Sequence, residues 1–216
     1  MTRLFVFDLD GTLVDSLRDL ADSANELLTS YGAAPLEMTA IGAMVGDGAA
    51  RLVARACASV GIAPRDALPR FLEIYDSKLL VHTRPYDGMP ETVAALGRSA
   101  SLAVLTNKPL AATKRILAGL DLDQFFDNDA VIGGDGPWPR KPDPSGLLPL
   151  CARVAVPPAD ALLVGDSLVD WQTARAAGSR ICLARYGFGY AGFPAPTLDG
   201  TEQLIDAPAD LLLIDP

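Results

Sequence analysis

Apolar residues follow a helical period through the first third of the chain. From residue 16 to about residue 83 they recur every three or four positions, which predicts helices and no strands. Turns that contain glycine or proline separate the expected helices. These helices cover Ser16–Tyr31, Pro35–Val45, Ala49–Val60 and Pro64–Val81. The pattern therefore predicts an all-helical unit in this part of the chain.

The pattern changes after the turn-rich segment Arg84–Pro90. Short apolar runs then alternate with helical stretches, which is typical of an α/β fold with a parallel sheet covered on both faces. The expected strands are Leu102–Thr106, Ala130–Ile132, Ala161–Val164 and Ile181–Leu183, and the helices are Pro90–Arg98, Leu110–Leu120, Pro144–Val154 and Val169–Ala177. The apolar run Arg3–Phe7 predicts a strand of the same sheet. We therefore expect a discontinuous core of residues 1–15 and 85–216, Rossmann-like, with residues 16–84 inserted as a helical cap.

Polar residues follow three of the expected strands directly. Asp8 and Asp10 come after Arg3–Phe7, Thr106 ends the next strand of the core, and Asp166 follows the strand at residues 161–164. Ligands of such sheets bind outside the carboxyl ends of the strands, so these residues are expected at one edge. Gly11 allows a sharp turn there and brings amide groups close to a bound anion.

The carboxylates at this edge predict a metal site. Asp8, Asp10, Asp166 and Asp170 would place up to four negative charges in a small volume, and each pair at ~4 Å costs about 4 kcal/mol at an effective dielectric constant near 20. Lys141 supplies one positive charge. A hard divalent cation with oxygen ligands, Mg²⁺, would supply the rest.

The same residues suit phosphoryl transfer. Asp8 can attack phosphorus while Lys141 and the cation neutralise the phosphate oxygens. Asp10 can donate a proton to the leaving oxygen and then, as a base, activate water against the aspartyl phosphate. Thr106 offers a hydroxyl group and Asn107 an amide to a phosphate oxygen.

Four segments of the chain resemble, in order and spacing, the motifs of the haloacid dehalogenase superfamily. They are Phe7–Ser16, Leu105–Lys108, Arg140–Pro144 and Val164–Asp170. Within the superfamily the chain is most similar to phosphoglycolate phosphatase-like enzymes, which is supported by the cap segment Met44–Ala49 and by Gly133–Asp135 before the lysine.

The resemblance implies roles for particular residues. Mg²⁺ would be held by Asp8, Asp166 and the backbone carbonyl of Asp10, with Asp170 supporting from behind. Gly46 belongs to a cap turn, Gly46-Asp47-Gly48, that would reach down to the core site. Arg51, just inside the next helix, is then the nearest cap cation for a substrate carboxylate.

The expected substrate is a small phosphorylated metabolite. A small phosphorylated acid, 2-phosphoglycolate, comes first, and hexose phosphates and amino-sugar phosphates are the alternatives.

Composition limits the possible partners and compartment. The net charge is −9, which argues against nucleic-acid and anionic-membrane binding. No apolar run reaches the ~18 residues of a membrane span, and Asp8 interrupts the apolar start, unlike a signal peptide. Three widely spaced cysteines favour reduced thiols and a cytoplasmic location. Either a monomer or a homodimer fits the sequence.

Four other functions compete with the phosphatase. A receiver domain of a signalling protein takes its phospho-acceptor from a later strand and has no helical cap. A haloacid dehalogenase needs no acid/base partner two residues after the nucleophile, so Asp10 argues against it. A β-phosphoglucomutase-like enzyme carries a histidine on the first cap helix, where this chain has Asp19 and Leu20. A catalytically inactive binding module is disfavoured because no motif residue is missing.

Several polar residues outside the motifs are expected to be structural. Asp143, before Pro144, is predicted to be a helix N-cap, and Asp19 to cap or solvate the first cap helix. His82 is the only histidine and is predicted to be structural. Trp138 is expected either to anchor a loop or to line the site, and Arg55 either to be solvated or to face an anionic substrate.

Overall fold

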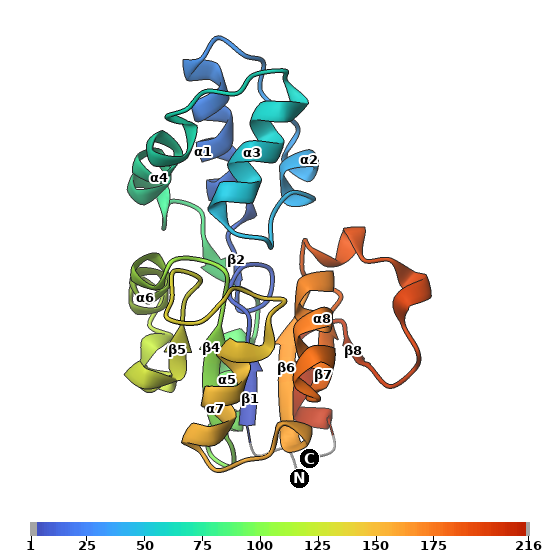
Figure 1. The fold of residues 1–216 in the computed structure, drawn as a ribbon. Coiled ribbons are helices and arrows are strands. Elements are labelled where there is room, and N and C mark those ends of the chain that lie inside the picture. The colour runs from blue at the N-terminus through green and yellow to red at the C-terminus, as the bar shows by residue number, and fades with distance from the viewer. Residues whose placement is uncertain (1–3, 215–216) are drawn as a thin grey trace.

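The computed structural model describes residues 4–214 and contains a parallel sheet of six strands in the order β5-β4-β1-β6-β7-β8 (Figure 1). The strands are β1 (Leu4–Phe7), β4 (Ser101–Leu105), β5 (Val131–Ile132), β6 (Ala161–Gly165), β7 (Arg180–Ala184) and β8 (Gln203–Ile205). All five neighbouring pairs are parallel. The predicted Rossmann-like α/β fold is thus confirmed, although Arg3, the expected start of the first strand, lies outside the described residues.

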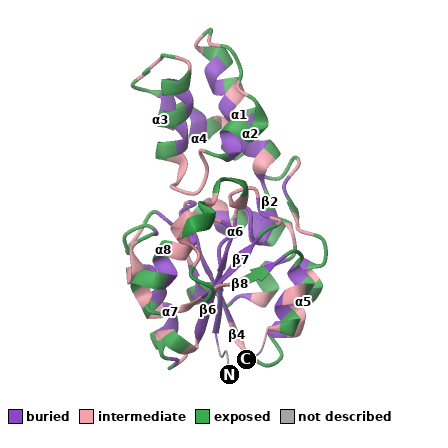
Figure 2. Ribbon diagram, turned by 90° about the vertical axis from the view of Figure 1, so that its right-hand side faces the viewer, coloured by how far each residue is buried: buried purple, intermediate pink, exposed green. Residues whose placement is uncertain are grey.

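Side chains of β1 alternate between the two faces of the sheet, because successive residues of a strand point in opposite directions. Phe5 and Phe7 pack on the face that is covered by α5 (Met89–Leu96) and α6 (Leu110–Gly119). Leu4 and Val6 pack on the face that is covered by α7 (Leu147–Arg153) and α8 (Leu168–Ala177). The whole strand is buried, so both layers of helices have an apolar sheet surface to cover (Figure 2).

Four helices form a separate layer above the carboxyl ends of the strands (Figure 1). They are α1 (Leu17–Ser30), α2 (Met38–Gly42), α3 (Ala49–Ser59) and α4 (Ala67–Lys78). Their apolar residues pack on one another, with Leu27, Leu28 and Phe71 fully enclosed.

Helix α2 is much shorter than the predicted helix Pro35–Val45. The side chain of Asn25 accounts for its late start. It donates to the Leu36 carbonyl at 2.9 Å and accepts from the Leu36 amide at 2.8 Å, so Leu36 is held in the connecting segment.

Two antiparallel chain crossings connect the helical layer to the sheet. β2 (Val14–Asp15) leads out of the core and pairs with β3 (Arg84–Pro85), which leads back. Asp19, at the start of α1, is buried and accepts hydrogen bonds from the backbone amides of His82 and Thr83. The expectation that Asp19 only caps or solvates its helix is therefore replaced by a buried link between the two crossings. We propose that these crossings bound the cap, residues 16–84, on a core of residues 1–15 and 85–216.

The sixth strand, β8, was not predicted. It is three residues long and lies at the sheet edge, with Leu204 exposed, so it has no clear apolar pattern. The remaining described elements are short 3₁₀ helices: Asp123–Phe125, Asn128–Ala130, Pro144–Gly146, Pro158–Asp160, Tyr190–Gly192, Ala195–Thr197 and Pro208–Leu213. Among residues 4–214, none of the helices has the length and apolar character that a membrane span needs.

Candidate active site

The carboxyl ends of three neighbouring strands place polar side chains at one edge of the sheet. Asp8 follows β1, Thr106 follows β4, and Asp166 follows β6. The strands end level with one another because Phe7 pairs with both Val104 and Val164. All three side chains are buried, so they are shielded from bulk water.

The turn after Asp8 depends on Gly11. Its φ of +85° is a left-handed conformation that favours glycine. A Cβ atom at Gly11 would lie 1.9 Å from Oδ2 of Asp166. The missing side chain therefore lets the turn lie directly against the acidic cluster.

Three buried carboxylates, those of Asp8, Asp166 and Asp170, have oxygens within 4.8 Å of one another. Burial and the Asp170 carboxylate, against the opposing effect of Lys141, together raise the pKa of Asp8 to about 6. Burial, followed by the charges of Asp170 and Asp8, raises the pKa of Asp166 well above its usual value. In both cases desolvation and like charge disfavour the ionised carboxylate.

Lys141 is the cation of this cluster. Its Nζ atom lies 2.9 Å from Oδ1 of Asp8 and 2.6 Å from Oδ1 of Asp170, and its side chain is 2% exposed. Burial opposes the lysine charge, but the carboxylates of Asp170 and Asp8 outweigh burial and raise the pKa of Lys141. Lys141 is therefore held in its charged form next to Asp8.

Asp170 has both oxygens occupied by protein donors. Oδ1 accepts from Lys141, and Oδ2 accepts from the amide and the hydroxyl of Ser167 at 3.1 and 2.6 Å. Ser167 in turn accepts from the Asp170 amide and completes a capping box at the start of α8. Asp170 is thus placed to hold Lys141 rather than to bind a ligand directly.

A loop after β7 covers Asp166. The amide of Gly189 donates to Oδ2 of Asp166 at 2.7 Å. A Cβ atom at Gly187 would lie 2.2 Å from the carbonyl oxygen of Gly11 and 2.3 Å from Cβ of Asp166. The loop can pack this closely only because Gly187 has no side chain.

The residues present fit a hard divalent cation. Asp8, Asp166 and Asp170 carry three negative charges when ionised, and Lys141 neutralises one of them. Oδ1 of Asp8 accepts no well-directed hydrogen bond, although Lys141 is near, so this buried oxygen lacks a full partner. Clustered carboxylate oxygens are the ligands that such cations prefer.

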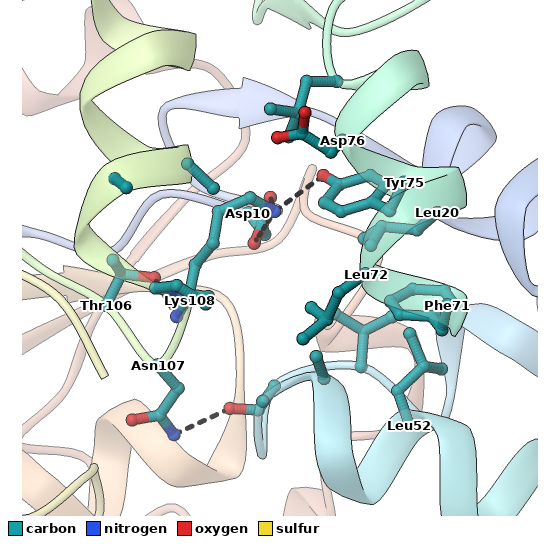
Figure 3. A pocket seen from close by; sticks show the side chains of 18 of the residues that line it. Asp10, Leu20, Leu52, Phe71, Leu72, Tyr75, Asp76, Thr106, Asn107 and Lys108 are labelled. Carbon is teal, nitrogen blue, oxygen red and sulfur yellow. Dashed lines mark hydrogen bonds and ion pairs between the residues drawn. The ribbon is translucent and has the colours of Figure 1, made fainter. Parts of the chain in front are cut away.

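Asp10 points away from this cluster. Both of its oxygens bind Nζ of Lys108, at 3.0 and 2.9 Å, and Oδ1 also accepts from the Ser16 hydroxyl at 2.5 Å. Lys108 Nζ lies 2.7 Å from the hydroxyl oxygen of Tyr75, on the cap helix α4. Figure 3 shows the side chains of Asp10, Lys108 and Tyr75 meeting at the wall of a cavity.

That cavity of about 240 Å³ lies between the helical layer and the strand ends. The core contributes polar residues, among them Asp8, Asp10, Thr106 and Lys108. The helical layer contributes mainly apolar residues: Leu20, Val45, Ala49, Leu52, Phe71, Leu72 and Leu79. The cavity is therefore a small chamber with one charged and one apolar wall.

The cap turn contacts the core next to the cavity. Asn107 donates from Nδ2 to the carbonyl oxygens of Gly46 and Lys141, at 2.9 and 3.0 Å. These contacts bring Gly46 to the strand ends, but they also use the Asn107 amide that was expected to face a phosphate. Thr106 is buried, and its hydroxyl accepts from the Lys108 amide at 3.2 Å, which leaves its proton available to an anion.

Other residues singled out from the sequence lie outside the cavity. Arg51 is exposed on α3 and does not line it, so its contact with a substrate stays a prediction. Arg55 pairs with Asp47, and Trp138 is 40% exposed away from the lining. His82 lies near the chain crossing and does not line the cavity either, and its Nε2 atom is 4.0 Å from Oδ2 of Asp22.

Asp143 accepts from the Ser145 amide at 2.9 Å as the N-cap of a 3₁₀ helix. The predicted N-cap at Asp143 is thus confirmed.

The comparisons with known proteins agree with this geometry. Residues 5–184 match the sequence model of the haloacid dehalogenase-like hydrolases. This match covers far more than half of the chain. The chain belongs to the haloacid dehalogenase-like hydrolase family.

Individual relatives show which members of the family the chain is similar to. A phosphoglycolate phosphatase of Nitrosospira multiformis is 40% identical over 193 residues, which are 86% of this chain and 84% of the relative. One of Rhodospirillum rubrum is 41% identical over 199 residues, covering 87% and 81% of the two chains. A crystal structure of a predicted phosphoglycolate phosphatase from Haemophilus somnus 129pt superposes with a TM-score of 0.89 at 31% identity, covering 98% of this chain and 96% of that one. The chain is therefore a phosphatase of this family, similar to phosphoglycolate phosphatases.

Several contributors to the site were not assigned from the sequence, among them Lys108, Tyr75 and Gly189. Lys108 stands within the second motif and is one of only four lysines, which is a signal that could have found it. Tyr75 and Gly189 belong to distant segments, and no local pattern marks either one. Their role near Asp10 and Asp166 depends on how the cap helix and the loop after β7 fold back onto the strand ends.

Proposed function

We propose that this phosphatase hydrolyses a small phosphate monoester through an aspartyl phosphate on Asp8, with Mg²⁺ as cofactor. The observation that carries the proposal is Asp8 itself. It is buried at the end of β1, lies 2.9 Å from Lys141, lines the cavity, and has an oxygen that accepts no well-directed hydrogen bond. A nucleophile needs such an oxygen, and the nearby cation stabilises the developing charge.

Asp8 attacks phosphorus, and the bond from phosphorus to the ester oxygen breaks. The leaving oxygen takes a proton from Asp10, which lines the same cavity and acts as the acid once one of its two oxygens, both now bound to Lys108, has taken up a proton. Asp10, now a carboxylate, removes a proton from the water that attacks the phosphoryl group on Asp8. The bond from phosphorus to Asp8 then breaks, inorganic phosphate leaves, and Asp8 returns to its original form.

The other core residues bind and orient the phosphoryl group. Lys141 donates to its oxygens, and the Thr106 hydroxyl donates a further hydrogen bond. Mg²⁺ would be held by Asp8, Asp166 and the carbonyl of Asp10, and when bound it would neutralise charge on the phosphate oxygens. Asp170 holds the ammonium group of Lys141 in position and does not contact the phosphoryl group itself.

The substrate that we propose first is 2-phosphoglycolate. Two relatives named phosphoglycolate phosphatase are 40% and 41% identical to this chain, and the cavity of about 240 Å³ suits a molecule of that size. The apolar cap wall offers hydrogen-bond partners neither to the hydroxyl groups of hexose phosphates and amino-sugar phosphates nor to a carboxylate, so this order of substrates rests on the relatives and on the size of the cavity. The same wall favours, as a second candidate, a phosphate ester with a small apolar group.

The test compares Asp8→Asn with Asp123→Asn, a change at an exposed aspartate outside the cavity. Release of phosphate from 2-phosphoglycolate, a hexose phosphate and an aryl phosphate is measured with Mg²⁺. Acid-quenched protein is analysed by mass spectrometry for a phosphoryl group on the peptide that contains Asp8. We expect Asp8→Asn to remove both turnover and the adduct, and Asp123→Asn to retain them. Turnover by Asp8→Asn at more than a small fraction of the original rate would refute the nucleophile.

A further inference from the structure

The carboxylate of Asp10 is held by a cation that the mechanism above does not use. Lys108 Nζ lies 3.0 and 2.9 Å from the two oxygens of Asp10. The Lys108 side chain is 4% exposed and that of Asp10 is 13% exposed, so little water competes for the pair. Burial opposes the charge of Lys108, and the two oxygens of Asp10 together with the hydroxyl oxygen of Tyr75 compensate for it by contacting Nζ directly.

The cap holds Lys108 from the opposite side. The hydroxyl oxygen of Tyr75, on α4, accepts from Nζ at 2.7 Å, and Nζ also lies 4.6 Å from the centre of the Tyr75 ring. Both contacts favour a cation at this position. Asp76, the neighbouring acid on α4, pairs with Arg115 on α6, so it is engaged elsewhere and does not draw Lys108 away.

We propose that Lys108 is a positioning residue for the general acid Asp10, and that Tyr75 makes this positioning depend on the closed cap. The proposal rests on the phosphatase mechanism proposed above. Asp10 lies beyond the end of β1, in a turn, and its carboxylate must stay within hydrogen-bond distance of the leaving oxygen. Lys108 and Ser16 restrict the orientation of that carboxylate. If α4 moves away, Tyr75 leaves Lys108, and the acid loses part of its support before the substrate is enclosed.

The dependence of the rate on the leaving group distinguishes a positioning role of Lys108 from a merely structural role and from binding of a substrate carboxylate. A poor leaving group such as phenolate needs the proton of Asp10 more than 4-nitrophenolate does. Misplacing the acid should therefore slow phenyl phosphate more than 4-nitrophenyl phosphate. These aryl esters are similar in size and carry no carboxylate, so a direct contact between Lys108 and a substrate carboxylate would not affect them.

The experiment measures kcat/KM of wild type and Lys108→Met on a series of substituted phenyl phosphates and on 2-phosphoglycolate. Since general acid catalysis contributes roughly 10²–10⁴-fold, we expect losses of at least about tenfold on phenyl phosphate and 2-phosphoglycolate, and under about threefold on 4-nitrophenyl phosphate. The plot of log kcat/KM against the leaving-group pKa should become steeper. Lys114→Met, which removes a lysine that contacts only Asn128 among the described side chains, should leave the slope unchanged.

Tyr75→Phe tests the cap contact and guards against a folding defect in Lys108→Met. It removes one hydroxyl group and keeps the ring, and it should steepen the same plot with a loss of about threefold on phenyl phosphate. Tyr31→Phe, which removes a hydroxyl that binds Asp66 on the cap surface, is the matched control.

Three outcomes are decisive. Equal losses across the whole aryl series would mean that Lys108 is merely structural, and would overturn the proposal. A loss confined to 2-phosphoglycolate would make Lys108 a carboxylate-binding residue and would also overturn it. If wild type releases no phosphate from any of these esters, the proposed function itself fails, and that result is distinct from both.

Discussion

Asp19 joins the first cap helix to the chain segment that returns to the core. Its carboxylate accepts from the His82 amide at 2.9 Å, and from the amide and the hydroxyl of Thr83 at 2.8 Å each. Asp19 and Thr83 are both fully buried. Replacement by alanine would therefore leave donors without partners at the hinge between the two layers.

The size of the effect follows from these contacts. A buried donor without a partner costs about 1–3 kcal/mol, and a hydrogen bond to a charged group contributes about 1.5–3 kcal/mol. The Thr83 amide is enclosed, whereas His82 is partly exposed and can bind water, so we expect Asp19→Ala to lower the free energy of unfolding by about 3 kcal/mol. With a slope of about 2 kcal/mol per molar urea, the midpoint should fall by about 1.5 M.

The assay is urea unfolding followed by circular dichroism, with Asp22→Ala as the matched control. Asp22 lies on the same helix but is exposed, and its pairs with Arg18 and His82 span 3.8 and 4.0 Å. Exposed pairs of this kind contribute at most about 1 kcal/mol, so the control should unfold close to wild type. Equal midpoints for the two variants would refute the argument that Asp19 is a buried link.

Four further predictions concern the site. Activity should disappear in EDTA and return with Mg²⁺, while Ca²⁺, with its looser coordination, should inhibit; full activity in the chelator would remove the need for a cation. Asp166→Ala should weaken Mg²⁺ binding in calorimetry more than Asp170→Ala, whose oxygens already bind protein donors. Gly187→Ala should reduce both activity and stability by forcing the loop away from Gly11, and a fully active variant would contradict that close packing. Interconversion of glucose 1- and 6-phosphates should be absent in a coupled assay, and its detection would favour a mutase.

Local sequence determined the elements and the chemistry at the strand ends. The continuous apolar run Leu4–Phe7 already implies a strand with two buried faces, and an acidic pair directly after it implies a site at the sheet edge. Asp8, Thr106 and Asp166 could be predicted together because each directly follows a strand, and parallel strands end at a common edge.

Tertiary structure alone decided which side chains complete the site. Lys108 and Asp10 are 98 positions apart, and Lys108 and Tyr75 are 33 apart. The first contact depends on the pairing of β1 with β4, and the second depends on how α4 packs over the strand ends. A residue type encodes neither arrangement. Arg51 was predicted to contact the substrate because of its position on a cap helix, but it is exposed and does not line the cavity. Lys108 lines the cavity because of the way the chain folds. Sequence periodicity predicts which face of a helix or strand is buried, but only the tertiary packing determines which residues that face contacts.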